Sequence, residues 1–194
     1  DGAFASIQYI MRDVEYGYII RYMHTTGASA FFALIYLHMF RGMMYGSYQK
    51  PRELLWVLGW ITYVLLCALG FTGYVLPWGQ MSFWAAQVIL SLLGSIPIIG
   101  EDLLTWIRGD YLISGITLNR LFAFHVVLLP LALIAVVFVH ILALHEVGSN
   151  NPDGVDVKKF KDEDGIPLDT KPFFPYDVMH DLYAIGVFLI FFVT

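Results

Sequence analysis

The stretch FHVVLLPLALIAVVFVHILALHEVGS, residues 124–149, decides the fold class of this chain. Between Phe124 and Val147 its side chains are apolar except for three histidines, at positions 125, 140 and 145, and one glutamate. A run of roughly 20 apolar residues is long enough to cross a bilayer as an α-helix. The stretch therefore predicts a membrane-spanning helix, and ionisable residues inside such a helix typically belong to a functional site.

The composition of the whole chain agrees with a membrane protein. Hydrophobic residues make up 58% of the 194 residues, charged residues only 14%, and the mean hydropathy is +0.67. We expect an all-α integral membrane protein, a bundle of spanning helices that forms a single membrane domain over residues 1–194. We place an interfacial segment at about 1–18 and spanning helices at about 19–44, 54–76, 119–146 and 176–194. The last span reaches the C-terminus without a charged flank, and the chain begins without Met, so we expect a piece of a longer protein.

The long connection at 77–118 is too apolar to be a solvated loop. Pro77 and Pro97 divide it, and its tryptophans are typical of a membrane interface, so we expect short helices on the membrane surface. Lysines and arginines gather instead in the loops 45–53 and 147–175, which the positive-inside rule places in the cytoplasm. The net charge of −5 says little about partners, and the lack of a basic stripe predicts no nucleic-acid partner.

The histidines of two predicted spans form two pairs. His24 and His38 are 14 residues apart (38 − 24), which is about 21 Å along a helix and nearly the same helix face. His125 and His140 are 15 residues apart (140 − 125), and we expect Pro130 to kink or over-wind the helix and so absorb the extra residue. Because one span separates these two helices, they run in the same direction. His24 should therefore lie level with His125, and His38 level with His140.

Two histidines at each of two depths fit haem better than zinc. Zinc usually takes four ligands, often with a thiolate or carboxylate, whereas haem iron takes two axial ligands because the porphyrin supplies the others. Gly59 and Gly73, also 14 residues apart (73 − 59), would let a flat macrocycle approach the backbone at the same two depths. Arg21 and Arg41 flank the histidines toward opposite surfaces and could pair with haem propionates. Each histidine taken alone could equally make helix–helix hydrogen bonds or belong to a proton relay.

Longer motifs resemble a known family. The chain is similar to cytochrome b, the di-haem membrane subunit of the quinol:cytochrome c oxidoreductase (cytochrome bc1 complex), in a proteobacterial form. The segments that carry the resemblance are RYMHTTGASAFF, HMFRGMMYGSY, GYVLPWGQMSFWAAQVI, TLNRLFAFH and HEVGSNNPDGV. It covers nearly all of the chain, and it implies a bacterial inner membrane with the connection 77–118 on the periplasmic side.

The resemblance implies that the four paired histidines are axial ligands to the iron of two non-covalent b-type haems. The low-potential haem would be held by His24, His125, Arg21 and Gly73, and the high-potential haem by His38, His140, Arg41 and Gly59.

The resemblance also implies two quinone sites on opposite faces of the membrane. The wall of the quinol-oxidation site would include Tyr74, Met81, Ala85, Val88 and Ile89, and the quinone-reduction site would include His145, Ser149, His180 and Asp181. The family often has glycine at position 85 and lysine at position 180. A titratable imidazole at position 180 could still deliver protons.

The activity implied is a bifurcated oxidation of ubiquinol. One electron would pass to the Rieske iron–sulfur protein and then cytochrome c1, and the other would cross both haems to reduce quinone on the other side. Lipid and a second copy of the complex are further expected partners. The family's first helix and its later PEWY segment are absent from this sequence, so we expect the piece alone to be inactive.

Two alternatives stay open at this point. A b6f-type cytochrome b is a close relative, although that type normally ends after the helix with the second histidine pair. A proton-coupled transporter would also place histidines in the membrane. It would not need pairs at matched depths, and it would more naturally show intramembrane carboxylates.

Overall fold

The structure is a computed structural model that describes residues 2–155, 159–168 and 170–193. Within those ranges the secondary structure is helical, and strand-like pairing is limited to one bridge between Lys161 and Pro167. The prediction of an all-α fold is confirmed. In chain order the described helices are α1 Ala3–Arg12, α2 Gly17–Met44, α3 Glu53–Val75, α4 Gln80–Gly94, α5 Gly100–Arg108, α6 Gly115–Ala123, the π-helix η1 Phe124–Leu128, α7 Leu129–Val147, the π-helix η2 Phe173–Asp177 and α8 Val178–Val193.

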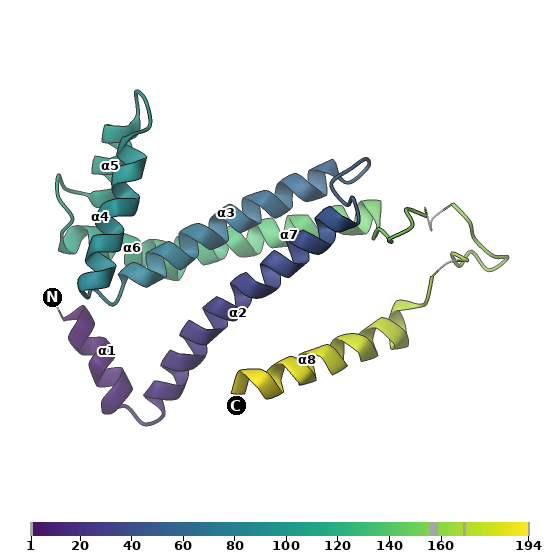
Figure 1. Cartoon of the computed structure of the whole chain (residues 1–194), viewed down its shortest axis with the longest axis horizontal. Coiled ribbons are helices and arrows are strands. Elements are labelled where there is room, and N and C mark those ends of the chain that lie inside the picture. The colour runs from purple at the N-terminus through teal and green to yellow at the C-terminus, as the bar shows by residue number, and fades with distance from the viewer. Residues whose placement is uncertain (1, 156–158, 169, 194) are drawn as a thin grey trace.

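The long helices form one tight pair with two helices beside it (Figure 1). α3 and α7 pack against each other along much of their length. α2 approaches this pair near its own C-terminus, where the ring of Trp56 lies 3.1 Å from the position that a Cβ on Gly42 would take, and it diverges toward its N-terminus. α8 lies apart from α3 and α7, and its Phe192 ring comes near Gly27 of α2.

Three of the described helices are long and apolar enough to cross a membrane: Glu53–Val75, the continuous helix Gly115–Val147, and Phe173–Val193. α2, predicted as a fourth span, has sufficient length at 28 residues. It falls short in apolarity because polar side chains, among them Arg21, His24 and Thr25, interrupt its hydrophobic residues.

The helix that contains His125 and His140 accommodates their 15-residue spacing, one more than that of His24 and His38, in a π-turn. Pro130 has no N–H to donate, and just before it the Leu129 N–H bonds the Phe124 carbonyl, five residues back. The predicted over-winding is wrong in direction. With a spacing of 15 residues instead of 14, His125 and His140 share a helix face only if the helix turns through a smaller angle per residue somewhere between them. A π-turn provides this, because it has more residues per turn than an α-helix.

The connection 77–118 contains the short helices that the sequence predicts. α4 and α5 form a hairpin that stands across the end of the α3–α7 pair (Figure 1). α6 starts with a capping box, in which the Ile116 N–H donates to Ser114 Oγ over 3.3 Å and the Ser114 N–H donates to Thr117 Oγ1 over 3.1 Å.

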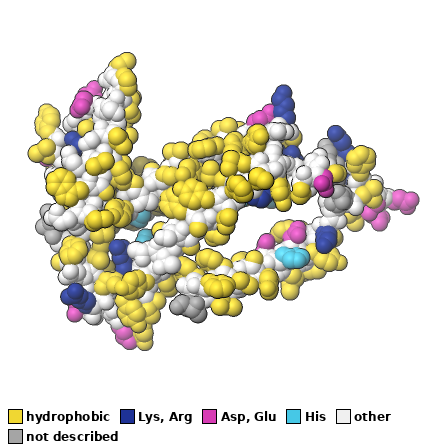
Figure 2. All heavy atoms as spheres, in the orientation of Figure 1, with side chains coloured by type: hydrophobic (Ala, Val, Ile, Leu, Met, Phe, Trp, Pro, Cys, Tyr) yellow, Lys and Arg dark blue, Asp and Glu magenta, His cyan; other side chains and the backbone are white. Residues whose placement is uncertain are grey.

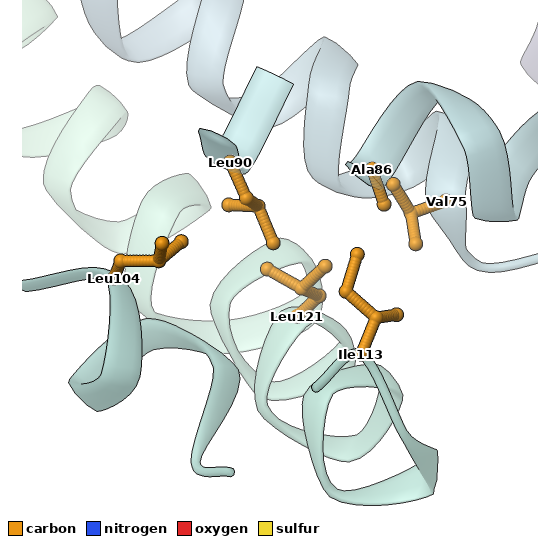
Figure 3. Packing of buried hydrophobic residues seen from close by; sticks show 6 residues of the cluster. All are labelled: Val75, Ala86, Leu90, Leu104, Ile113 and Leu121. Carbon is orange, nitrogen blue, oxygen red and sulfur yellow. The ribbon is translucent and has the colours of Figure 1, made fainter. Parts of the chain in front are cut away.

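The buried core of the described chain lies where this hairpin meets α3 and α6 (Figure 3). Its members are Val75, Ala86, Leu90, Leu104, Ile113 and Leu121. The most apolar parts of the spanning helices, in contrast, have almost no buried residue. The hydrophobic effect drives burial where water is the alternative environment, and helices in lipid need no such burial because acyl chains are as apolar as leucine.

This difference in burial predicts a stability contrast within α4. Leu90 is 1% exposed and Leu92 is 65% exposed. We expect Leu90→Ala to lower the free energy of unfolding by about 2–5 kcal/mol, because it leaves a cavity in the core. Leu92→Ala is the matched control and should cost less than about 1 kcal/mol. Denaturation of the purified full-length protein in detergent measures both, and equal losses would contradict this location of the core.

Candidate functional site

The structure brings the four paired histidines together at two separate levels. The ring centroids of His24 and His125 lie 6.1 Å apart, and those of His38 and His140 lie 6.5 Å apart. In both pairs one ring comes from α2 and the other from the continuous helix that contains α7, while α3 packs beside that helix. The imidazoles of His125 and His140 are half-buried, whereas those of His24 and His38 are more exposed.

These centroid separations leave room for one metal ion between the two imidazoles of a pair. Metal–imidazole bonds of about 2 Å place two opposing nitrogens roughly 4 Å apart, and each ring centroid lies about 1 Å farther out. A bis-histidine haem therefore needs centroids roughly 6 Å apart, which both pairs provide. Within the described ranges no cluster of three or more His, Cys, Asp or Glu side chains could hold a bare metal ion. The donor set thus suits an iron whose remaining ligands come with a macrocycle.

The glycines of α3 make room for imidazoles. A Cβ on Gly73 would overlap the His125 ring, and a Cβ on Gly59 would lie 3.3 Å from His140 Cε1. From the sequence we expect these glycines to let a flat macrocycle approach the backbone. In the structure, the space left by their missing Cβ atoms is taken by the two histidines of the neighbouring helix.

The reason for this arrangement is a backbone carbonyl. Nδ1 of His125 lies 2.9 Å from the Leu69 carbonyl oxygen, one turn before Gly73. A helical side chain leans over the turn N-terminal to its own Cα, so a glycine at position 73 uncovers that carbonyl. A second neighbour of Nδ1 is the buried Thr72 hydroxyl, at 3.4 Å. Sequence reasoning missed both partners, although the glycine spacing marked the correct turn of α3.

The second level repeats the spacing of glycine and carbonyl but not the hydrogen bond. Nδ1 of His140 is buried without a hydrogen bond of good geometry, and the neighbouring backbone acceptor is Leu55. Leu55 precedes Gly59 by four residues, as Leu69 precedes Gly73, and the two leucines are 14 residues apart (69 − 55). α3 therefore presents a glycine and a carbonyl at each of the two histidine depths.

A large cavity opens where α2 diverges from α3, and α1, the start of α4, α6 and η1 contribute the rest of its lining. Its volume is about 1610 Å³, and its lining includes His24 and His125 together with Arg21, Tyr74 and Met81. Apolar surface dominates the lining, which is typical of a site for an apolar cofactor or ligand. Arg21 lines the same cavity as the first histidine pair, and its role toward a haem propionate stays a prediction.

The second histidine level is closed at one end by polar links between the turns. Arg52 donates from Nε to the Gly148 carbonyl over 3.0 Å and from Nη2 to the Ser149 carbonyl over 3.2 Å. Asn150 Nδ2 donates to the Tyr45 carbonyl over 2.7 Å. These bonds join the ends of α2, α3 and α7. Arg41, predicted to flank this site, lies three residues after His38, and its guanidinium carbon lies 6.0 Å from the Tyr45 ring centroid.

The residues predicted for the quinol-oxidation wall fall on α3 and α4. Tyr74 and Met81 line the cavity and are also widely exposed. Val88 and Ile89 are exposed on the outer side of α4, and Ala85 is half-buried. Four of these five residues therefore lie on one helix, α4, and Tyr74 lies in the last turn of α3.

The residues predicted for quinone reduction are not brought together. His145 lies in the last turn of α7 and Ser149 two residues after its end, whereas His180 and Asp181 lie in the first turn of α8, beyond the loop. Within the described ranges no hydrogen bond or ion pair joins the two groups, and His180 Nδ1 instead lies 2.9 Å from the Tyr176 carbonyl of its own helix.

Comparison with known proteins found a matching family model, similar proteins of known sequence and a similar solved structure. The family model described as Cytochrome b/b6/petB matches residues 1–148. The chain is 57% identical to cytochrome b of Allochromatium vinosum, over 98% of this chain and 47% of that protein, and 51% identical to cytochrome b of Rickettsia typhi, over 99% and 46%. A solved structure titled "Hyperthermophilic respiratory Complex III" matches with a TM-score of 0.88 at 36% identity, over 99% of this chain and 50% of that chain.

The chain spans about half the length of the curated relatives it matches. The match to the Allochromatium vinosum protein extends over 98% of this chain. The family is one of integral membrane proteins that bind b-type haem, which agrees with the spanning helices and with the facing imidazoles. On the matched family model and these identities, the chain belongs to the cytochrome b family.

Proposed function

We propose that this chain forms the haem- and quinone-binding core of the cytochrome b subunit of a quinol:cytochrome c reductase. The observation that carries the proposal is the pair of facing imidazoles at each of two depths, with centroids 6.1 and 6.5 Å apart. A proton-coupled transporter does not need this duplication, and the curated relatives quoted above are named cytochrome b.

Each histidine pair would hold one b-type haem. His24 and His125 are the proposed ligands at the level of the large cavity, and His38 and His140 at the other level. A bound haem supplies reversible one-electron transfer at its iron. Two such carriers, separated by about 21 Å along a helix, would cover much of a hydrocarbon core about 30 Å thick.

α3 would act as the orienting helix for both sites. When Nδ1 of His125 donates to the Leu69 carbonyl, the other ring nitrogen is the unprotonated one and is free to bind iron. Such a bond on the far side of a ligating imidazole also fixes the orientation of the ring. Gly59 and Gly73 permit the approach, and Arg21 and Arg41 would compensate the charge of propionates.

The remaining assignments follow from the family. Ubiquinol oxidation would use the wall formed by Tyr74, Met81, Ala85, Val88 and Ile89, and ubiquinone reduction would use His145, Ser149, His180 and Asp181. The proposed partners are the Rieske iron–sulfur protein, cytochrome c1, membrane lipid and a second copy of the complex. We place the protein in a bacterial inner membrane, with loops 45–53 and 147–175 cytoplasmic and 77–118 periplasmic.

The test is a haem count on the full-length protein in its complex. We expect two b haems per chain by extraction, visible in the reduced-minus-oxidised spectrum. His24→Ala should remove one haem and His38→Ala the other, because each substitution deletes one axial ligand. Loss of the same spectral component in both variants would contradict the two-site proposal. A folded complex that contains no haem would contradict it entirely.

A second prediction tests the role of the glycines. Gly73→Ala should deplete the haem held by His24 and His125, because the new Cβ overlaps the His125 ring. Gly59→Ala should have a smaller effect on the other haem, because a contact of 3.3 Å requires only a small shift.

Gly186→Ala on α8 is the matched control, since a Cβ there has no neighbour within 4 Å. Haem content and the spectrum of each variant give the answer. Full retention of both haems in Gly73→Ala would show that the glycine is not needed for the approach of His125.

A further inference from the structure

A hydroxyl group of α3 faces the imidazole at the first histidine level. Thr72 is 5% exposed, and its Oγ1 lies 3.4 Å from Nδ1 of His125. The glycine and the carbonyl beside His125 both recur 14 residues earlier in α3, but the residue 14 positions before Thr72 is Leu58 (72 − 14), which is apolar. Within the described residues, Nδ1 of His140 is buried without a hydrogen bond of good geometry. The two histidine levels therefore differ in what meets Nδ1.

The donors at the neighbouring carbonyls determine where the Thr72 hydroxyl proton points. Oγ1 reaches two acceptors of its own helix, the Ala68 carbonyl at 2.9 Å and the Leu69 carbonyl at 3.0 Å. A carbonyl oxygen has two lone pairs. Those of Leu69 are taken by the Gly73 N–H, in the α-helical pattern of α3, and by Nδ1 of His125 at 2.9 Å. In the same pattern the Ala68 carbonyl takes the Thr72 N–H, which leaves one lone pair for the hydroxyl proton.

With its proton on the Ala68 carbonyl, Thr72 Oγ1 is an acceptor toward His125. The Leu69 carbonyl has no proton to give, so Nδ1 of His125 carries the ring proton at this contact. This N–H then meets two oxygens, at 2.9 and 3.4 Å, as a three-centre hydrogen bond. The other ring nitrogen is left unprotonated and free to bind a metal.

The hydroxyl influences the imidazole from outside the cavity. Figure 2 shows histidine side chains in the hollow where α2 diverges from α3, and Thr72 is not among the residues that line this cavity. A hydrogen bond accepted from the outer nitrogen of a ligating imidazole makes the inner nitrogen a stronger electron donor. Stronger donation favours the ferric state of a bound haem iron over the ferrous state, because the ferric ion has the higher charge.

We propose that Thr72 is a positioning residue that lowers the reduction potential of the haem held by His24 and His125. It acts through His125, because it holds the ring with its proton on Nδ1 and adds a second acceptor to that N–H. This role rests on the proposed function, since it requires a haem at the first level. Leu58 offers no hydroxyl at the other level, so α3 makes the surroundings of the two haems unequal.

The experiment is a redox titration of both haems in the purified complex, with Thr72→Val as the test variant. Valine keeps the branched shape of threonine and removes the hydroxyl. Thr72→Ser restores a hydroxyl and is the rescue variant, and Thr72→Ala replaces the test variant if the valine variant does not assemble. Thr62→Val is the matched control. Thr62 makes the same kind of bond on α3, to the Leu58 carbonyl over 2.9 Å, and in the described chain no hydrogen bond joins its hydroxyl to a histidine.

We expect Thr72→Val to raise the midpoint potential of the first-level haem, with a several-fold increase in its equilibrium constant for reduction. Thr72→Ser should keep the original value, Thr62→Val should change neither haem, and the haem of His38 and His140 should titrate alike in every variant. An unchanged or lower potential in Thr72→Val, in a complex that keeps two b haems per chain, would overturn the role of Thr72 and leave the proposed function standing. A folded parent complex without haem at this level would overturn both.

Discussion

The approach of His125 to the α3 backbone is the contact on which the site depends. Its Nδ1 lies 2.9 Å from the Leu69 carbonyl, and this is possible because position 73 has no side chain. The same glycine-and-carbonyl unit recurs 14 residues earlier, at Leu55 and Gly59. His125 is thus oriented by the helix beside it, whereas His140 lies next to the second unit without a hydrogen bond of good geometry at its Nδ1. The close packing of α3 with α7 therefore brings His125 to its carbonyl partner as well as building the bundle.

How far side chains are buried inside this protein depends on whether water or lipid is their alternative environment. The core around Leu90 and Leu121 forms where short helices meet the end of α3, while the apolar spans have almost no buried residues. A soluble protein of this composition would need a large interior. Here lipid provides the apolar environment for the spans, and the buried hydrophobic cluster of the described chain lies where the hairpin meets α3 and α6.

The separation of α2 from α3 and η1 creates the cavity. α2 is tied to the others at one end, through Gly42 against Trp56 and through the Asn150 bond to Tyr45. From there it diverges (Figure 1), and a volume of about 1610 Å³ opens around His24 and His125. A cofactor that binds both imidazoles would fill the gap that direct helix packing leaves.

The sequence by itself determined the helical membrane fold, the family, and the matched depths of the histidine pairs, because apolar length and residue spacing along a helix are local properties. Tertiary structure decided what those residues touch. The imidazoles fill the space above Gly59 and Gly73, a π-turn before Pro130 takes up the extra residue, and His180 and Asp181 lie apart from His145. Spacing fixes the helix face and the depth of a residue. The atom that meets it there depends on how neighbouring helices pack, which no single helix encodes.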